Sequence, residues 1–133
     1  MLSLVECMGL LRSVPVGRLV YTENALPAVR PMTFAAPAGE VVIPTGNDMW
    51  FDRFGGGVLA FETGTIDPVT RTGWSVVAMG RSRLLSGAGG LLGFDDSGRS
   101  PWQHRCGDSY LVIDIEYVTG RHTRLVRPHG DYR

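Results

Sequence analysis

The chain has 133 residues, 44% of them apolar, and its equal numbers of acidic and basic residues give a formal net charge of zero. This length suits one hydrophobic core, so we expect a single domain over residues 1–133. A neutral chain lacks the basic field that attracts nucleic acids or anionic membranes, and no apolar stretch approaches the roughly 18 residues that span a bilayer. We therefore expect a soluble, cytoplasmic protein that binds neither.

All thirteen basic residues are arginine. The absence of lysine excludes Schiff-base chemistry, covalently held pyridoxal phosphate and a Walker-type phosphate loop. An anion would have to be bound by arginine, backbone amides or hydroxyl groups. Cys7 and Cys106 lie far apart and belong to no CxxC pattern, which indicates reduced thiols rather than a disulfide framework or a zinc module.

The N-terminal part of the chain predicts one helix followed by two strands. Ser3 and Glu6 form a capping-box pattern, which predicts an amphipathic helix over residues 3–13. Its predicted buried face consists of Leu4, Val5, Met8 and Leu11. Strands are predicted at residues 16–22 and 27–35, joined by a turn that begins at Glu23-Asn24.

The second of these strands carries an arginine on a small, apolar face. The residues that alternate onto this face are Ala28, Arg30, Met32 and Phe34. Pro31 cannot donate a hydrogen bond to a neighbouring strand, so we expect this strand at the edge of a sheet or bulged at that point. The residues alone favour Arg30 as an edge residue that keeps its charge in water.

A third strand is predicted at residues 40–45, and the first three strands are expected to form a meander. Gly46-Asn47-Asp48 then offers an N-cap for a short helix over residues 49–54. The remaining predicted strands cover residues 58–62, 74–85 and 109–117, with loops over residues 64–72 and 86–105.

The last predicted strand has two alternating faces. One carries Tyr110, Val112, Asp114 and Glu116, and the other carries Leu111, Ile113, Ile115 and Tyr117. The alternation of Asp114 and Glu116 predicts solvent exposure rather than paired acid–base catalysis. Six strands with two or three short helices predict a mainly β (α+β) fold, a closed or nearly closed antiparallel barrel.

Several short segments resemble, in order and spacing, the pyridoxamine 5′-phosphate oxidase-like flavoproteins, which are six-stranded split β-barrels. The segments are Gly17-Arg18-Leu19, Arg30-Pro31, Ile43-Pro44-Thr45-Gly46, Phe61-Glu62, Gly73-Trp74-Ser75-Val76 with Gly80, and Val118-Thr119-Gly120-Arg121. The resemblance covers nearly the whole chain and agrees with the predicted barrel. It implies a homodimer that binds FMN in two equivalent clefts at the subunit interface.

The resemblance also implies which residues contact this cofactor. Beside the flavin ring and ribityl chain it places Arg30, Pro31, Met32 and Thr33. Around the phosphate it places Pro44, Thr45, Gly46, Asn47, Asp48 and Trp50. Trp74 and Ser75 would reach the flavin from the other protomer. We assign no catalytic side chain and no metal site, because the flavin itself carries the redox chemistry.

The turn after the third strand departs from the family pattern. Related sequences carry serine or threonine followed by arginine and lysine, whereas this chain has Asn47-Asp48-Met49-Trp50. Arg30 is then the nearest cation, and Arg53 is a second candidate. Three hypotheses stay open: an FMN-dependent oxidoreductase acting on an unidentified small molecule, a cofactor-free barrel that binds small molecules or serves as an accessory dimer, and a deazaflavin-binding reductase.

Other conspicuous residues have simpler interpretations. From the residues alone, Trp50 and Trp74 are expected in the core or a dimer interface rather than stacked on a flavin ring, although either could do both at an interface cleft. His104-Arg105-Cys106 matches no metal-site spacing and is expected in a loop. His122 is expected to be exposed after a strand, in an arginine-rich tail that begins at Arg121.

Overall fold

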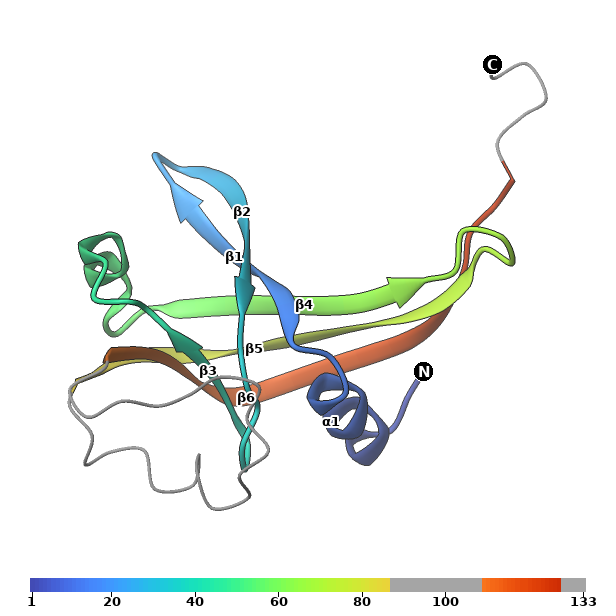
Figure 1. Ribbon diagram of the computed structural model, residues 1–133, viewed down its shortest axis with the longest axis horizontal. Helices are drawn as coiled ribbons and strands as arrows, with labels where there is room; N and C mark the ends of the chain where they lie inside the picture. The colour runs from blue at the N-terminus through green and yellow to red at the C-terminus, as the bar shows by residue number, and fades with distance from the viewer. Residues whose placement is uncertain (87–108, 128–133) are drawn as a thin grey trace.

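A computed structural model describes residues 1–86 and 109–127 of the chain. The elements in chain order are α1 (Leu4–Arg12), β1 (Val16–Glu23), β2 (Leu26–Thr33), β3 (Glu40–Pro44), the 3₁₀ helix η1 (Met49–Phe54), β4 (Val58–Ile66), β5 (Thr72–Ser86) and β6 (Ser109–Arg124). The strands form one antiparallel sheet in the order β2-β1-β4-β5-β6-β3 (Figure 1). This is the predicted fold class, a six-stranded split β-barrel.

The sheet curls until its two ends meet at one seam. Just beyond β2, Ala35 forms an isolated bridge with Val42 of β3, through two backbone N–H···O bonds of 2.9 and 2.8 Å. β2 and β3 do not pair along their lengths, so the barrel is split rather than fully closed. Pro31 lies on an edge strand, as predicted.

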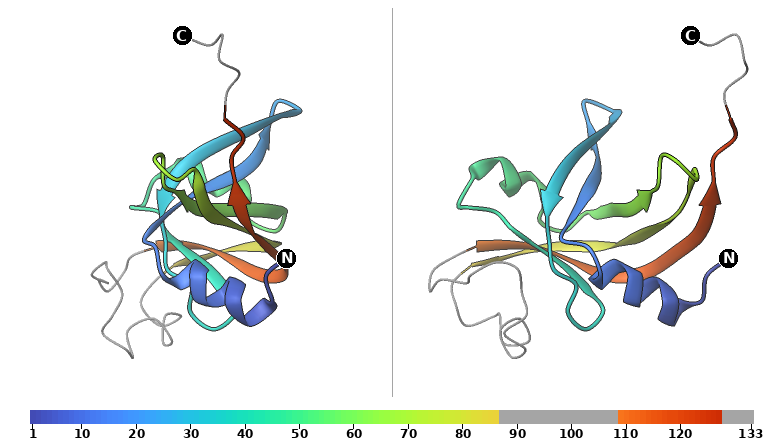
Figure 2. Two further views of the ribbon diagram at one scale, coloured as in Figure 1. Left: turned by 90° about the vertical axis from the view of Figure 1, so that its right-hand side faces the viewer. Right: turned by 45° about the vertical axis from the view of Figure 1, so that its right-hand side comes forward.

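The barrel interior is apolar and continuous with the inner face of α1. Phe34 and Phe61 meet at its centre, with ring centroids 4.6 Å apart. Cys7 and Leu11 of α1 are buried in the same cluster. Both views in Figure 2 place α1 against β6, away from the tip of the β1–β2 hairpin. Burial raises the pKa of the Cys7 thiol.

The start of α1 is as predicted, and of its predicted buried face Met8 and Leu11 pack in or against the core, whereas Leu4 and Val5 do not. The Ser3 hydroxyl accepts a hydrogen bond from the Glu6 N–H, and the Glu6 carboxylate accepts one from the Ser3 N–H, which completes the capping box. Leu4 and Val5 are 64% and 81% exposed. The helix instead meets the sheet through Cys7, whose sulfur would lie 2.7 Å from a Cβ added at Gly120.

The predicted meander of the first three strands is wrong. β1 and β2 form the expected hairpin, but β3 pairs with β6, with Val42 opposite Val112. The chain after β2 crosses to the other end of the sheet. The predicted pairing of β2 with β3 is replaced by the isolated bridge between Ala35 and Val42. A sequence pattern identifies strands, and it does not reveal such a crossing.

The structure also lengthens two predicted strands and shortens the loop between them. β4 continues to Ile66 and β5 begins at Thr72, so the predicted loop over residues 64–72 reduces to a turn at residues 67–71. The Asp67 carboxylate accepts the Val69 N–H (2.8 Å) in this turn. Gly64 interrupted the strand pattern, yet the strand needs glycine there, because a Cβ would lie 2.5 Å from the Trp74 carbonyl oxygen.

β6 continues to Arg124 and contains a β-bulge that reverses its faces. Met79 is opposite Tyr117 and Gly80 is opposite Ile115, so Glu116 is an extra residue. The buried side therefore changes from odd to even positions, which leaves Tyr117 60% exposed instead of sharing the face of Ile115. Tyr110 and Val112 are buried too, in a second small cluster, so the first part of β6 is covered on both faces.

Candidate functional site

An aromatic cluster joins the β1–β2 hairpin to η1. The Trp50 ring makes edge-on contacts with Tyr21, Phe51 and Phe54, at centroid distances of 5.3, 5.0 and 5.0 Å. Phe51 and Phe54 are buried, whereas Trp50 and Tyr21 are half-buried and pack against the main core. Trp50 is therefore anchored to the core while part of its surface faces solvent.

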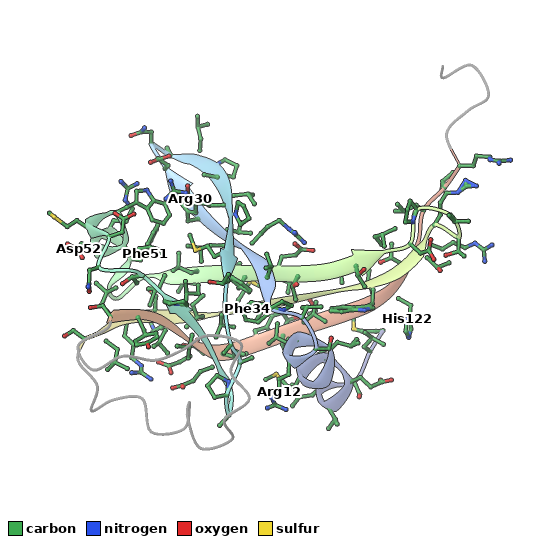
Figure 3. All side chains as sticks on the ribbon, in the orientation of Figure 1. Arg12, Arg30, Phe34, Phe51, Asp52 and His122 are labelled. Atoms are coloured by element: carbon green, nitrogen blue, oxygen red, sulfur yellow. The ribbon has the colours of Figure 1, made fainter. Side chains whose placement is uncertain are left out.

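Two arginines lie over the Trp50 ring. Arg30 reaches it from β2, with its guanidinium carbon 4.1 Å from the ring centroid (Figure 3). Arg53 reaches it from η1 at 5.3 Å and also forms an ion pair with Glu23 at 2.8 Å. Within residues 1–86 and 109–127, Arg30 has no carboxylate partner. Arg30 is thus more than an edge residue reaching into water, because its cation is held on an aromatic face.

The other predicted ring-side residues follow the alternation of β2. Met32 lies on the same face as Arg30 and packs against the core, while Pro31 and Thr33 are exposed. The pairing of β1 with β2 places Tyr21 opposite Ala28, which lies two residues before Arg30 on the same face of β2. Tyr21 and Glu23 were missed by sequence reasoning, although the hairpin register contained the signal that would have found them.

The predicted phosphate turn lies on a different side of η1. Thr45 is 7% exposed, and its hydroxyl donates to the Ser109 carbonyl at 3.2 Å. Asp48 is the N-cap of η1, as predicted, and its carboxylate accepts the Trp50 N–H at 2.9 Å. Gly46 and Asn47 have positive φ, which shapes the turn. Two of the groups expected to bind a phosphate, the Thr45 hydroxyl and the Trp50 N–H, are therefore already bonded within the chain.

The pocket beside this turn is acidic. It has a volume of about 340 Å³. Its described lining is Thr45, Asn47, Asp48, Met49, Phe51, Asp52, Leu84, Leu85, Ser86, Ser109 and Tyr110. The described part of the lining includes two carboxylates and no arginine, so its charge repels a doubly charged phosphate. Pro44, opposite Tyr110, ends β3 at its edge.

Trp74 and Ser75 do not meet Arg30 within one chain. The strand register aligns Arg30, through β1 and β4, with Ala78 of β5. Three inter-strand steps of about 4.8 Å and three residue steps of about 3.3 Å then separate Arg30 from Ser75. Trp74 is half-buried and packs against the core. Trp74 lies opposite His122 of β6. His122 is exposed, as expected, but it lies within β6 and not after the last strand (Figure 3).

Asp114 of β6 has a structural partner, which it shares with Glu40 of β3. Asp114 and Glu40 accept hydrogen bonds from Arg83 at 2.9 and 2.6 Å on the outer face of the sheet, and the hydrogen bond to Asp114 raises the pKa of Arg83. In the described part of the chain, no three His, Cys, Asp or Glu side chains are grouped to bind a metal ion. His104-Arg105-Cys106 lies outside the described residues. No helix among those described is long and apolar enough to cross a bilayer.

Comparisons with known proteins agree with this architecture. An uncharacterised protein of Mycobacterium tuberculosis is 35% identical over 121 residues, which cover 86% of this chain and 79% of that protein. The FAD-binding protein from Mycobacterium smegmatis has a TM-score of 0.75 and 25% identity, covering 94% of this chain and 98% of its own. A FAD-binding protein from Mesorhizobium loti has a TM-score of 0.68 and 23% identity, covering 92% and 96%.

A sequence model of the family described as pyridoxamine 5′-phosphate oxidase matches residues 3–122. This match includes β1 to β5 and all of β6 except its last two residues. The chain therefore belongs to the pyridoxamine 5′-phosphate oxidase family, whose split-barrel members include flavin-binding proteins.

Proposed function

We propose that this protein binds a flavin, with FMN as the cofactor, and is an oxidoreductase that acts on a small molecule. The observation that carries the proposal is Arg30, a cation without a described carboxylate partner, held 4.1 Å from the centroid of the Trp50 ring. It stands beside a half-buried aromatic cluster at an edge strand, a surface suited to a planar ring that bears an anionic chain. The name of the similar M. smegmatis protein adds support. A bound flavin would supply hydride or electron transfer, and the protein would orient it.

The residues expected around the flavin ring and those expected around its phosphate, which together would line the FMN-binding groove, differ in how well they suit FMN. Arg30, Met32 and Trp50 offer a cation and an apolar surface for the ring end. The turn at residues 45–48 does not suit the phosphate, because Asp48 occupies the Trp50 N–H and the adjoining pocket contains two carboxylates. The phosphate of FMN would therefore have to lie outside this turn.

FAD is a second candidate cofactor, and Asp48 is the observation that favours it. A terminal phosphate monoester carries close to two negative charges at neutral pH, whereas each phosphate of a pyrophosphate diester carries about one. A carboxylate near the turn therefore opposes FMN more strongly than FAD. Two similar structures are of FAD-binding proteins. Deazaflavin, which carries its charge on a longer tail, is a further alternative.

We also propose that the groove is completed by a second copy of the chain. Trp74 and Ser75 are too far from Arg30 within one chain, so they could reach the flavin only from a partner subunit. Among the described strands β2 pairs along its length with β1 alone, and it carries the exposed apolar side chains Leu26 and Val29. Light scattering coupled to size exclusion should show a mass of two chains, and a monomer would refute this arrangement.

Spectroscopy and thermal stability test the proposed function. The purified protein should show visible flavin absorbance, or acquire it with FMN or FAD, and the flavin should raise its melting temperature because it binds only the folded state. Arg30→Ala should weaken that binding. A colourless protein whose melting temperature does not change when FMN, FAD or deazaflavin is added would refute flavin binding and favour the cofactor-free accessory role.

A further inference from the structure

Two guanidinium groups converge on Trp50 from separate elements of the fold. Arg30 comes from β2 and Arg53 from η1, and their guanidinium carbons lie 4.1 and 5.3 Å from the same ring centroid. A guanidinium held on an aromatic ring keeps its N–H donors free around its own edge, where an oxyanion can accept them. The cluster therefore holds the N–H donors of two guanidinium groups beside one aromatic ring.

An internal carboxylate already binds one of these guanidinium groups. Glu23, at the end of β1, accepts a hydrogen bond from Arg53 at 2.8 Å, and both side chains are 43% exposed. Such an exposed ion pair is weak and easily exchanged for a better ligand. Arg30 has no carboxylate partner among the described residues, so an anion that contacted both arginines would meet one cation without such a partner and one replaceable contact.

Two donors of the expected phosphate turn are already bonded within the chain. The Asp48 carboxylate takes the Trp50 N–H, and Thr45 donates its hydroxyl to a backbone carbonyl. The acidic pocket beside them contains no arginine in its described lining. Among the described residues, the cations that contact the Trp50 ring and could bind the anionic end of a flavin are Arg30 and Arg53.

We infer that Arg30 and Arg53 together bind the phosphate ester of the flavin, and that Glu23 competes with this phosphate for Arg53. The inference rests on the proposed flavin binding and specifies where the phosphate is held. Arg53 thereby replaces the basic residues that the turn lacks, and Glu23 tunes phosphate affinity. The same donors would bind the terminal phosphate of FMN or the pyrophosphate of FAD.

Equilibrium binding of riboflavin, FMN and FAD tests the inference, because riboflavin carries the ring without a phosphate. Arg53→Gln should raise the Kd of the tighter-binding phosphorylated flavin at least about tenfold, while the Kd of riboflavin changes less than about twofold. Arg53→Lys keeps the positive charge but loses the planar, bidentate guanidinium, so its Kd for the phosphorylated flavin should lie between those of the wild type and Arg53→Gln. Glu23→Gln should lower the same Kd several-fold. A larger effect on FAD than on FMN would identify the pyrophosphate as the bound group.

Arg81→Gln is the matched control, since Arg81 is exposed and points to the face of β5 opposite the buried Ser82. It removes the same charge and should leave all three Kd values unchanged. Equal losses for riboflavin and FMN in Arg53→Gln, no loss for either, or weaker binding in Glu23→Gln would overturn the inference and leave the proposed function intact. Failure of the wild-type protein to bind any flavin would overturn both.

Discussion

Gly80 permits the β-bulge that reverses the faces of β6, so replacing it tests this part of the fold. A Cβ added at Gly80 would overlap the carbonyl oxygen of Asp114, and would lie 2.8 Å from its carbonyl carbon and 3.1 Å from the Glu116 nitrogen. These are backbone atoms of the paired strand, which cannot rotate away as a side chain could. Gly80→Ala should therefore push β6 away from β5 where its register changes.

The expected cost follows from this clash. Overpacking in a well-packed region lowers the free energy of unfolding by about 1–3 kcal/mol. A small domain has a urea m-value of about 1–3 kcal/mol/M, so the unfolding midpoint of Gly80→Ala should fall by about 1 M. Urea unfolding followed by circular dichroism measures this shift, and an unchanged m-value would show that the variant still unfolds as one unit.

Gly9→Ala is the control for the same chemical change at an open position. Gly9 is exposed within α1, and a Cβ there would have no neighbour within 4 Å. Alanine favours a helix over glycine by about 0.5–1 kcal/mol, so this variant should be more stable than the wild type. A Gly80→Ala midpoint equal to that of the wild type would refute the argument that the bulge requires glycine.

Three further changes test other parts of the structure. Asn24 and Ala25 both have positive φ at the tip of the β1–β2 hairpin, so Ala25→Gly should stabilise the protein by about 1 kcal/mol in urea unfolding, and a loss of stability would contradict this. The hydrogen bonds from Ser3 lower the pKa of Glu6, so its contribution to stability is present above its unfolded pKa and is lost as the pH falls through its folded pKa. The stability difference between the wild type and Glu6→Gln should accordingly be present at neutral pH and vanish in acid, and a difference that persists in acid would have another cause. Burial raises the pKa of Cys7, so in a Cys106→Ser background a thiol-reactive disulfide should label the chain in urea and not in buffer, and equal labelling rates would contradict the burial.

Local signals in the sequence predicted the elements well, and distant pairings decided what they missed. Ser3 and Glu6 identify the start of α1 because a cap involves only neighbouring residues. The β3–β6 pairing joins residues about seventy positions apart, and nothing in either strand specifies its partner. One extra residue, Glu116, reverses the alternation of buried and exposed positions in β6. A sequence pattern of period two does not predict where such a bulge occurs.

In the candidate site, too, some residues could be predicted from the sequence, whereas others depend on contacts between distant segments. Arg30 and Trp50 were expected at the cofactor because they match family positions, and the structure brings them together. Asp48 was expected to place a negative charge in the phosphate turn, and in the structure its carboxylate caps η1. Tyr21 and Glu23 join the site only through the hairpin register and the packing of η1. Trp74 and Ser75 stay a prediction about a second subunit.

The seam of the barrel also sets how the molecule can loosen. One bridge between Ala35 and Val42 joins the ends of the sheet, whereas β5 and β6 are paired over most of their lengths. Amide exchange at Ala35 and Val42 should therefore be faster than in the middle of β5, because so few bonds must break there. β2 leads directly into this seam and also carries Arg30. A ligand that ties Arg30 to η1 would restrain the strand beside the seam, so occupancy of the groove should slow the opening of the barrel itself.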